Sequence, residues 1–195
     1  MTWSIIFHDR PTGRIGIAVA TKFFAVGARV PNIEPQKGAV CTQALTNPLY
    51  GPHGLRLIRE GVGAADVVRL LTIPDAGREH RQIHVMGADG RFAARTGAEC
   101  VPWCGHWIGD DMSVAGNMLA GPAVVSETVR VLRERTDLAL PRRLIAARVG
   151  LAKSGAAIWL WAEGSALSSA ITATSEGPAK TSMPTLPNSA RLASA

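Results

Sequence analysis

The residue with the clearest potential for chemistry is Thr2, which directly follows the initiating Met1. Threonine is small enough at this position for a methionine aminopeptidase to remove Met1, and we expect that removal to leave Thr2 with a free α-amine. An α-amine has an ordinary pKa of about 7.7 to 8.0, so at neutral pH it can act as general base for the hydroxyl group of its own residue. The pattern therefore predicts a nucleophilic threonine, and the competing interpretation is that Thr2 simply begins a β-strand.

A second group of potentially reactive side chains lies near residue 100. Cys100 and Cys104 are followed by His106, and thiolates and imidazoles are common zinc ligands. No matching second pair accompanies them, so the spacing favours buried structural cysteines. The three cysteines of the chain, an odd number, do not suggest a disulfide framework either. We expect no metal ion and no cofactor.

Composition limits the class of protein. The chain has 195 residues, of which 47% are hydrophobic and 18% are charged, which is enough apolar material for one sizeable core and one domain. Asp9 and Arg10 interrupt the first apolar run, which therefore does not resemble a secretory signal. No later stretch approaches the roughly 18 uncharged residues of a membrane-spanning helix. We expect a cytoplasmic protein that does not contact a membrane.

The net charge of +6 would suit a nucleic-acid partner if the basic residues formed one face. Six arginines fall between residues 130 and 148, but Glu127, Glu134 and Asp137 lie among or beside them at helical spacing. Mixed charges at this spacing are typical of a solvated helix face. We therefore expect no nucleic-acid partner.

The elements that would position the reactive groups follow from hydrophobic periodicity and turn residues. β-Rich runs predict a hairpin at the start, a third strand before the breaker cluster at residues 47–52, and three further strands in the middle. Apolar residues at helical spacing predict two helices after each group of strands. The order βββααβββαα predicts two antiparallel sheets with helices outside, an α+β architecture. The predicted strands are 4–7, 15–20, 38–45, 82–86, 91–96 and 113–119, and the predicted helices are 54–60, 64–71, one that begins at residues 121–122, and 141–152.

The character of the sequence changes after Ala152. Residues 154–195 are dominated by Ala, Ser, Thr and Pro, and Trp159 and Trp161 lie in a segment without a clear period. Such a composition predicts no regular structure. We therefore divide the chain into a domain of residues 1–152 and a divergent tail of residues 153–195.

Several short segments, taken together, resemble a known family. They are similar to the bacterial and archaeal family called domain of unknown function 1028, and the blocks around Lys22 and between Gly116 and Pro122 are the most specific. That family is considered similar in fold to the Ntn (N-terminal nucleophile) hydrolases, so the resemblance implies a four-layer αββα sandwich. The matching segments are 4–7, 16–20, 22–27, 42–44, 47–48, 50–52, 87–90, 96–97, 100–103, 105–106 and 116–122.

The layout also resembles a proteasome-type β subunit, and this resemblance implies a catalytic site. The hydroxyl oxygen of Thr2 would attack a carbonyl carbon. Lys22 would lower the pKa of the amine or bind a carboxylate. Asn47 and Asn117 would donate hydrogen bonds to the oxyanion that forms.

Two further residues are expected to contact the substrate, Gln43 and His106. Structural interpretations stay open beside these roles. Lys22 would also be ordinary as a surface lysine after a strand, and Asn47 as a turn residue before a proline. His106 would be ordinary as a structural histidine.

The resemblance to the family ends at the fourth predicted helix. Family members continue with a Gly-Gly-Asp segment, a Gly-x-Gln-Ser-Ala stretch that leads into a hydrophobic strand, and an Asp-His-x-Asp-Pro sequence, none of which this chain contains. A shifted reading frame would explain both this difference and the composition of the tail. We therefore expect a sandwich that is incomplete at its C-terminus, with unpaired strand edges and poor folding as consequences.

Two functions are compatible with the sequence. The first is a hydrolase of C–N amide bonds that acts through Thr2 on a small amide or peptide-like compound. The second is a non-catalytic or inactive family member with a role in binding or assembly. Paired sheets with exposed helices suit a homo-oligomer in either case, and the sequence does not reveal the substrate.

Overall fold

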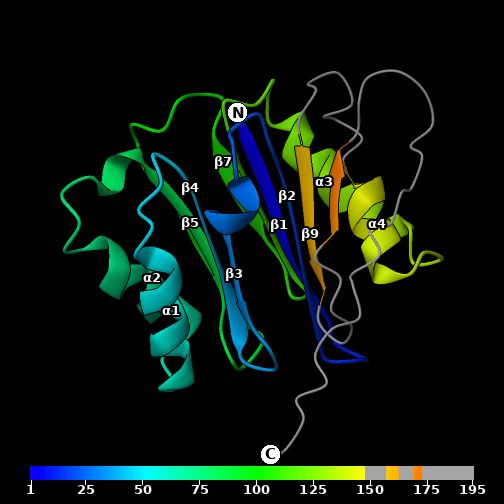
Figure 1. Cartoon of the computed structure of the whole chain (residues 1–195), viewed down its shortest axis with the longest axis horizontal. Helices are drawn as coiled ribbons and strands as arrows, with labels where there is room; N and C mark the ends of the chain where they lie inside the picture. Colours follow the sequence, from blue (N-terminus) through cyan, green and yellow to red (C-terminus); the bar gives the residue numbers. More distant parts are fainter. Residues whose placement is uncertain (148–156, 163–168, 173–195) are drawn as a thin grey trace, which may run out of the picture.

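Two antiparallel sheets pack face to face, and two helices cover the outer face of each (Figure 1). The structure is a computed structural model that describes residues 1–147, 157–162 and 169–172. Its layers follow the order helix, sheet, sheet, helix. The predicted four-layer αββα architecture and the α+β fold class are therefore confirmed.

The larger sheet, sheet A, is built around the predicted hairpin. β1 (Thr2–Asp9) and β2 (Arg14–Thr21) pair along their whole length, which sets Thr2 opposite Thr21. The turn between them closes because Gly13 adopts a φ of 69°, a value that glycine reaches without steric cost. The other strands are β7 (Gly105–Ile108), β8 (Met112–Asn117), β9 (Ala157–Ala162) and β10 (Ser169–Thr172), and the order across the sheet is β10-β9-β2-β1-β8-β7.

The smaller sheet, sheet B, has four strands in the order β3-β4-β5-β6, which are β3 (Pro31–Glu34), β4 (Gly38–Ala44), β5 (Arg81–Met86) and β6 (Phe92–Thr96). Its outer face is covered by α1 (Tyr50–Arg59) and α2 (Ala64–Thr72). Sheet A is covered by α3 (Ala123–Glu134) and α4 (Leu140–Ala146). Short 3-10 helices span Val26–Ala28 and Arg78–His80.

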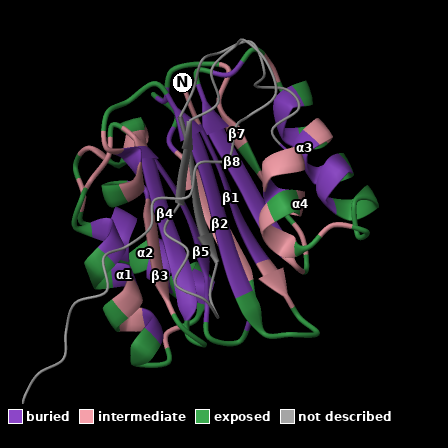
Figure 2. Ribbon diagram, turned by 45° about the vertical axis from the view of Figure 1, so that its right-hand side comes forward, coloured by how far each residue is buried: buried purple, intermediate pink, exposed green. Residues whose placement is uncertain are grey.

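Burial follows these layers (Figure 2). An apolar layer between sheet A and its helices includes Trp3, Ile5 and Leu132, all with no exposed surface. A second layer between sheet B and its helices includes Val67 and Ile83. The third layer lies between the two sheets, and it is apolar over only part of its extent. Its apolar members are Ile6, Ile15, Ile17, Val19, Val26, Val30, Ala39, Cys41 and Met86.

The observed helices and strands agree largely with those predicted from the sequence. All the predicted strands and helices are present, with ends shifted by a few residues. Two short strands, β3 and β7, were not predicted. α4 ends at Ala146, and residues 148–152 of the predicted last helix lie outside the described residues.

β9 and β10 lie in the segment for which the composition predicted no regular structure. β9 pairs antiparallel with β2, from Ala157 opposite Thr21 to Ala162 opposite Gly16, and β10 pairs with β9. The edge of β2 is therefore paired, where the sequence analysis expected an unpaired edge. The rest of the predicted tail lies outside the described residues.

The basic helix region carries paired charges, as its spacing suggested. On α3 the Arg130 side chain donates to Glu127 at 2.9 Å and also contacts Glu134. Arg135 pairs with Asp137 at 2.9 Å. In the part of the chain that the structure describes, no helix is both long enough and apolar enough to cross a membrane.

Candidate active site at the Thr2 end of the sandwich

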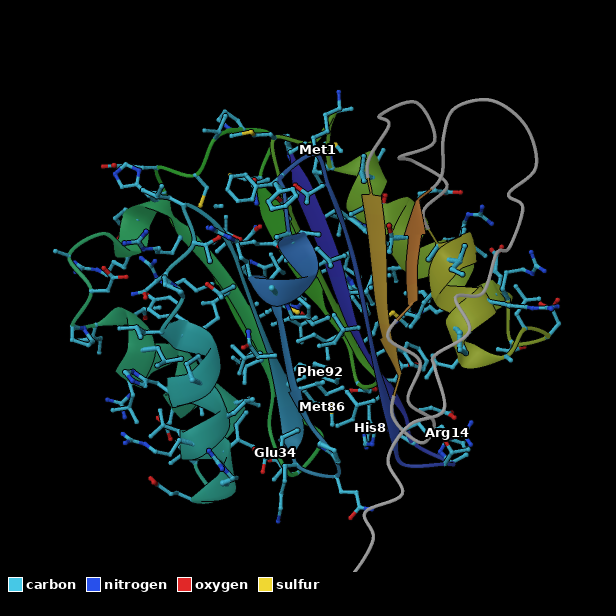
Figure 3. The ribbon with its side chains drawn as sticks, viewed as in Figure 1. Met1, His8, Arg14, Glu34, Met86 and Phe92 are labelled. Atoms are coloured by element: carbon cyan, nitrogen blue, oxygen red, sulfur yellow. The ribbon has the colours of Figure 1, made fainter. Side chains whose placement is uncertain are left out.

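The predicted nucleophile lies at one end of the layer between the two sheets. Side chains alternate along a strand, and because Ile6 of β1 packs between the sheets, Thr2 and Ser4 point there as well. Thr2 stands opposite Thr21 on one side and Asn117 on the other. Directly opposite side chains have Cβ atoms about 4.5 to 5.5 Å apart. The polar row Thr21, Thr2 and Asn117 therefore crosses three strands at the end where Figure 3 labels Met1.

The Thr2 hydroxyl is oriented by Thr21. The two hydroxyl oxygens are 3.1 Å apart. The Thr21 hydroxyl donates its one proton to the Met1 carbonyl at 2.8 Å, so the proton between the two threonines belongs to Thr2. The Phe23 N–H also donates to the Thr21 oxygen, at 3.2 Å. Thr21 was not singled out from the sequence, although the hairpin register would have identified it as the neighbour of Thr2.

The terminal amine of Met1 lies at the same end and is sensitive to Lys22. The amine contacts the sulfur of Met118 at 3.1 Å. Its pKa is lowered, chiefly by burial and further by the positive charge of Lys22. The Lys22 side chain itself is exposed. The role expected of Lys22 at the Thr2 amine stays a prediction.

Gln82 of β5 connects the two sheets beside this row. Its amide nitrogen lies 3.0 and 2.9 Å from the carbonyl oxygens of Gly105 and Gly116 and 2.8 Å from the Thr96 hydroxyl, so its two protons are shared among three acceptors. Carbonyl oxygens only accept, so the orientation of the Gln82 amide is determined. Its oxygen must then accept, and it does so from Asn117 at 3.2 Å.

The same oxygen of Gln82 accepts a hydrogen bond from Gln43 at 2.7 Å. Gln43 therefore presents its own oxygen to Ser4, whose hydroxyl donates to it at 2.6 Å. Two of the predicted site residues, Gln43 and Asn117, thus donate to the same oxygen of Gln82. Gln82 was not among the site residues predicted from the sequence. All three side chains are buried.

The network continues from Ser4 to His84. Because the Ser4 proton is directed to Gln43, Nε2 of His84 must donate to the Ser4 oxygen at 2.8 Å. Nδ1 of His84 then accepts from Ser113, at 3.0 Å. Burial lowers the pKa of His84 to about 3. The imidazole is therefore neutral at physiological pH, and its tautomer follows from its partners.

His106 joins the network at its edge. Its Nδ1 lies 2.9 Å from the Thr96 hydroxyl, which is bound to Gln82. Although much of the residue is exposed, neighbouring protein atoms desolvate the imidazole and lower its pKa. The structure therefore links His106 to Gln82 through Thr96.

Asn47 belongs to a different cluster. Its side-chain nitrogen donates to Asp75 at 3.2 Å and its oxygen accepts from the Leu49 N–H at 3.1 Å. Tyr50 and Arg81 also donate to Asp75, at 2.7 and 3.1 Å. These hydrogen bonds, that of Tyr50 first, hold the pKa of Asp75 well below its ordinary value. Asn47 is thus bound to Asp75, which follows α2, and to Leu49 in its own loop before α1.

Backbone strain is concentrated at the Thr2 end. Four non-glycine residues in the described part of the chain have positive φ, and three of them lie at or just after the ends of strands that end here. They are Ala25 after β2, Ala44 directly after Gln43, and Met118 directly after Asn117. Such conformations cost on the order of 1 to 3 kcal/mol and are common at functional sites.

The cysteines are engaged in local contacts. Cys100 contacts the Arg81 carbonyl at 3.3 Å and Cys104 contacts the Cys100 carbonyl at 3.4 Å. Within residues 1–147, 157–162 and 169–172, no group of three or more His, Cys, Asp or Glu residues is arranged to hold a metal ion.

Comparison with known proteins assigns the chain to a family. The model of the family of unknown function DUF1028 matches residues 2–158. The chain belongs to this family. Its fold resembles the crystal structure of the DUF1028 protein SPO2555 from Silicibacter pomeroyi, with 32% sequence identity and a TM-score of 0.75. The similarity covers 82% of this chain and 75% of that protein.

The function of the DUF1028 family is unknown, and no curated protein matches the chain. The match spans the Thr2 row, the Gln82 network and the first residues of β9. Membership therefore accounts for the architecture.

Proposed function

We propose that the protein is an Ntn-type amidohydrolase in which Thr2, once Met1 is removed, is the nucleophile for a small amide or peptide-like substrate. The observation that carries the proposal is the polar row of Thr21, Thr2 and Asn117 at an end of the sandwich. There the Thr2 hydroxyl has a defined hydrogen-bond partner and Asn117 is held by Gln82. The concentration of strained residues at the same end supports the same location.

Removal of Met1 is the activating step in this proposal. While Met1 is present, the nitrogen of Thr2 belongs to a peptide bond and cannot accept a proton. After removal it is an amine beside its own hydroxyl group. Burial and Lys22 already lower the pKa of the Met1 amine. The new amine lies one residue further into the sheet, where the same influences favour its neutral, basic form.

The reaction follows from these groups. Removal of Met1 also removes the carbonyl that accepts the Thr21 proton, so Thr21 can donate to the Thr2 oxygen and leave the Thr2 proton to the amine. The Thr2 amine takes this proton, and the oxygen attacks the carbonyl carbon of the amide. The tetrahedral intermediate breaks its C–N bond, and the ammonium group returns the proton to the leaving nitrogen. Water then hydrolyses the acyl ester on Thr2, which releases the acid and restores the hydroxyl group.

Asn117 is the proposed donor to the oxyanion. One proton of its amide group is directed to Gln82, which leaves the second proton for the substrate. A preorganised donor of this kind contributes about 10²- to 10³-fold to the rate of acyl transfer. Asn117 stands directly opposite Thr2 in sheet A, whereas Asn47 is bound to Asp75 beside α1, so we propose that Asn117 carries this role.

The test compares the unsubstituted chain with Thr2→Ala and Thr2→Ser. Intact mass first establishes that Met1 is absent from all three, because each second residue is small. A panel of small amides and dipeptides is then assayed for release of amine. We expect hydrolysis by the unsubstituted chain, slower hydrolysis by Thr2→Ser, and a loss of at least about 10³-fold in Thr2→Ala.

Two outcomes would contradict the proposal. One is a mature chain that retains Met1, since the base would then be missing. The other is hydrolysis that survives Thr2→Ala unchanged. Folding of Thr2→Ala is checked by its thermal transition, so that loss of activity is not confused with loss of structure.

A further inference from the structure

Exposed apolar side chains are concentrated around the candidate active site. Nine large apolar side chains are exposed in the described residues, and seven of them lie in the connections at the Thr2 end. The seven are Phe23, Phe24, Leu45, Leu49, Ile73, Val101 and Met118.

Two phenylalanines are the most prominent of these. Phe23 is 61% exposed and Phe24 is 90% exposed, in the connection directly after β2. The backbone of Phe23 is bound to Thr21, the partner of the proposed nucleophile. Val26, only 2% exposed, anchors the same connection in the layer between the sheets. The aromatic pair is therefore attached to the site by a hydrogen bond and a buried side chain.

A positive charge accompanies the aromatic pair. Lys22 directly precedes Phe23, and among the residues that the structure describes no carboxylate forms an ion pair with it. Its charge already acts on the terminal amine. Arg29 adds a second cation nearby, 5.2 Å above the ring of Phe23. Unpaired cations of this kind attract an anionic ligand.

From this juxtaposition we infer that the substrate is a small anionic amide with an apolar or aromatic group on one side of the amide bond and a carboxylate on the other. The apolar group packs against Phe23 and Phe24, and the carboxylate interacts with Lys22. The inference rests on the proposed function, because it assigns a substrate class to the Thr2 site. It makes Phe24 and Lys22 specificity-determining residues.

Binding to a chain that cannot react tests this inference. The full chain with Thr2→Ala, freed of Met1, is titrated calorimetrically with three probes: N-benzoylglycine, N-acetylglycine and N-methylbenzamide. The second probe lacks the aromatic ring and the third lacks the carboxylate. We expect N-benzoylglycine to bind at least about tenfold more tightly than either comparator, which corresponds to about 1.4 kcal/mol.

Two further substitutions in this background separate the two contacts. Phe24→Ser should abolish the preference over N-acetylglycine, and Lys22→Gln should abolish the preference over N-methylbenzamide. The matched controls are Leu70→Ser, an exposed apolar residue of α2, and Lys37→Gln, next to Glu34 at the opposite end of the sandwich in Figure 3. Both controls should keep both preferences.

Equal affinity for the three probes would overturn the inference. So would a Phe24→Ser chain with unchanged preferences and a smaller mass in solution, because the apolar side chains would then form an interface between copies of the protein. Hydrolysis by the unsubstituted chain is measured separately. If the chain hydrolyses amides but binds the three probes equally, only the proposed substrate class is overturned. If it prefers N-benzoylglycine but hydrolyses no amide, the proposed function is contradicted and the class of ligand is supported.

Discussion

The layer between the two sheets has two halves of opposite character. β1 contributes Ser4 to a buried hydrogen-bond network and, two residues later, Ile6 to an apolar cluster. β5 changes in the same way, from Gln82 to Met86. The polar half lies toward Thr2, and the apolar half lies toward the end where Figure 3 labels Met86 and Phe92.

The two halves contribute differently to the protein. Apolar burial stabilises the fold by removing surface from water, at roughly 25 cal/mol per Å². A buried hydrogen bond contributes only about 0.5 to 1.5 kcal/mol net, but a donor left without its partner costs about 1 to 3 kcal/mol. The polar half therefore adds modest stability and determines the orientation of Asn117 and Gln43. Stability therefore comes mainly from the apolar half, and the polar half positions the side chains of the candidate site.

The largest effect on stability is expected in the apolar half. Ile17 is completely buried between the sheets, and Ile17→Ala should lower the free energy of unfolding by about 2 to 5 kcal/mol. Ile17→Val, which removes one methyl group, should cost about 0.5 to 1.5 kcal/mol. Denaturant titration measures both. At temperatures where they remain folded, both variants should keep the amide hydrolysis proposed for Thr2.

Gln82→Met should lower stability by a similar amount and, unlike Ile17→Ala, should also lower activity. Methionine fills similar space but leaves Gln43 and Asn117 without their acceptor, so we expect a loss of about 1 to 3 kcal/mol for each buried donor that water cannot reach. Freed from Gln82, Asn117 would no longer be oriented, and kcat should fall more than the affinity for substrate. The matched control is Met112→Leu, a buried apolar exchange in the outer layer. Normal activity in Gln82→Met would contradict the positioning role of the polar half.

Sequence patterns predicted the outer layers well and the inner polar half poorly. Helical spacing on α3 and the β-rich run of β1 are local signals, and both were interpreted correctly. Gln82 and His84 alternate with Ile83 and Val85, which is the pattern of a strand with one face in water. In the structure both faces of β5 are buried, and the polar face is satisfied by partners up to 80 residues away in sequence.

The predicted site residues show the same limit. Thr2 was identified from its position after Met1, and Asn117 and Gln43 were identified through resemblance to a family; the structure connects the last two through Gln82. Asn47 was identified in the same way, but Asp75, 28 residues later, binds its amide. Short motifs mark residues near strand ends. They do not determine which partner each side chain meets after the sheets have packed.

Acid should destabilise the polar half through His84. Burial lowers its folded-state pKa to about 3, whereas an unfolded histidine titrates near 6.5. Between these values only the unfolded chain binds the proton, so stability falls as pH decreases below about 6.5, by about 2 kcal/mol at pH 5 from this residue. His84→Gln should remove about one proton from the uptake on unfolding, measured as the slope of unfolding free energy against pH. An unchanged slope would mean that His84 is solvated in the folded protein.

The smallest effect is expected at the end of the polar half, where water can partly replace lost contacts. Thr21→Val removes the hydroxyl that is hydrogen-bonded to the Thr2 hydroxyl and that accepts from the Phe23 N–H, and we expect about 1 kcal/mol of lost stability. The proposed hydrolysis should slow by about tenfold, because the nucleophile loses its orienting partner. Thr21→Ser keeps the hydroxyl group and should restore most of the rate. If serine and valine at this position behave alike, Thr21 acts by packing alone, and the positioning role of the polar half would begin deeper, at Gln82.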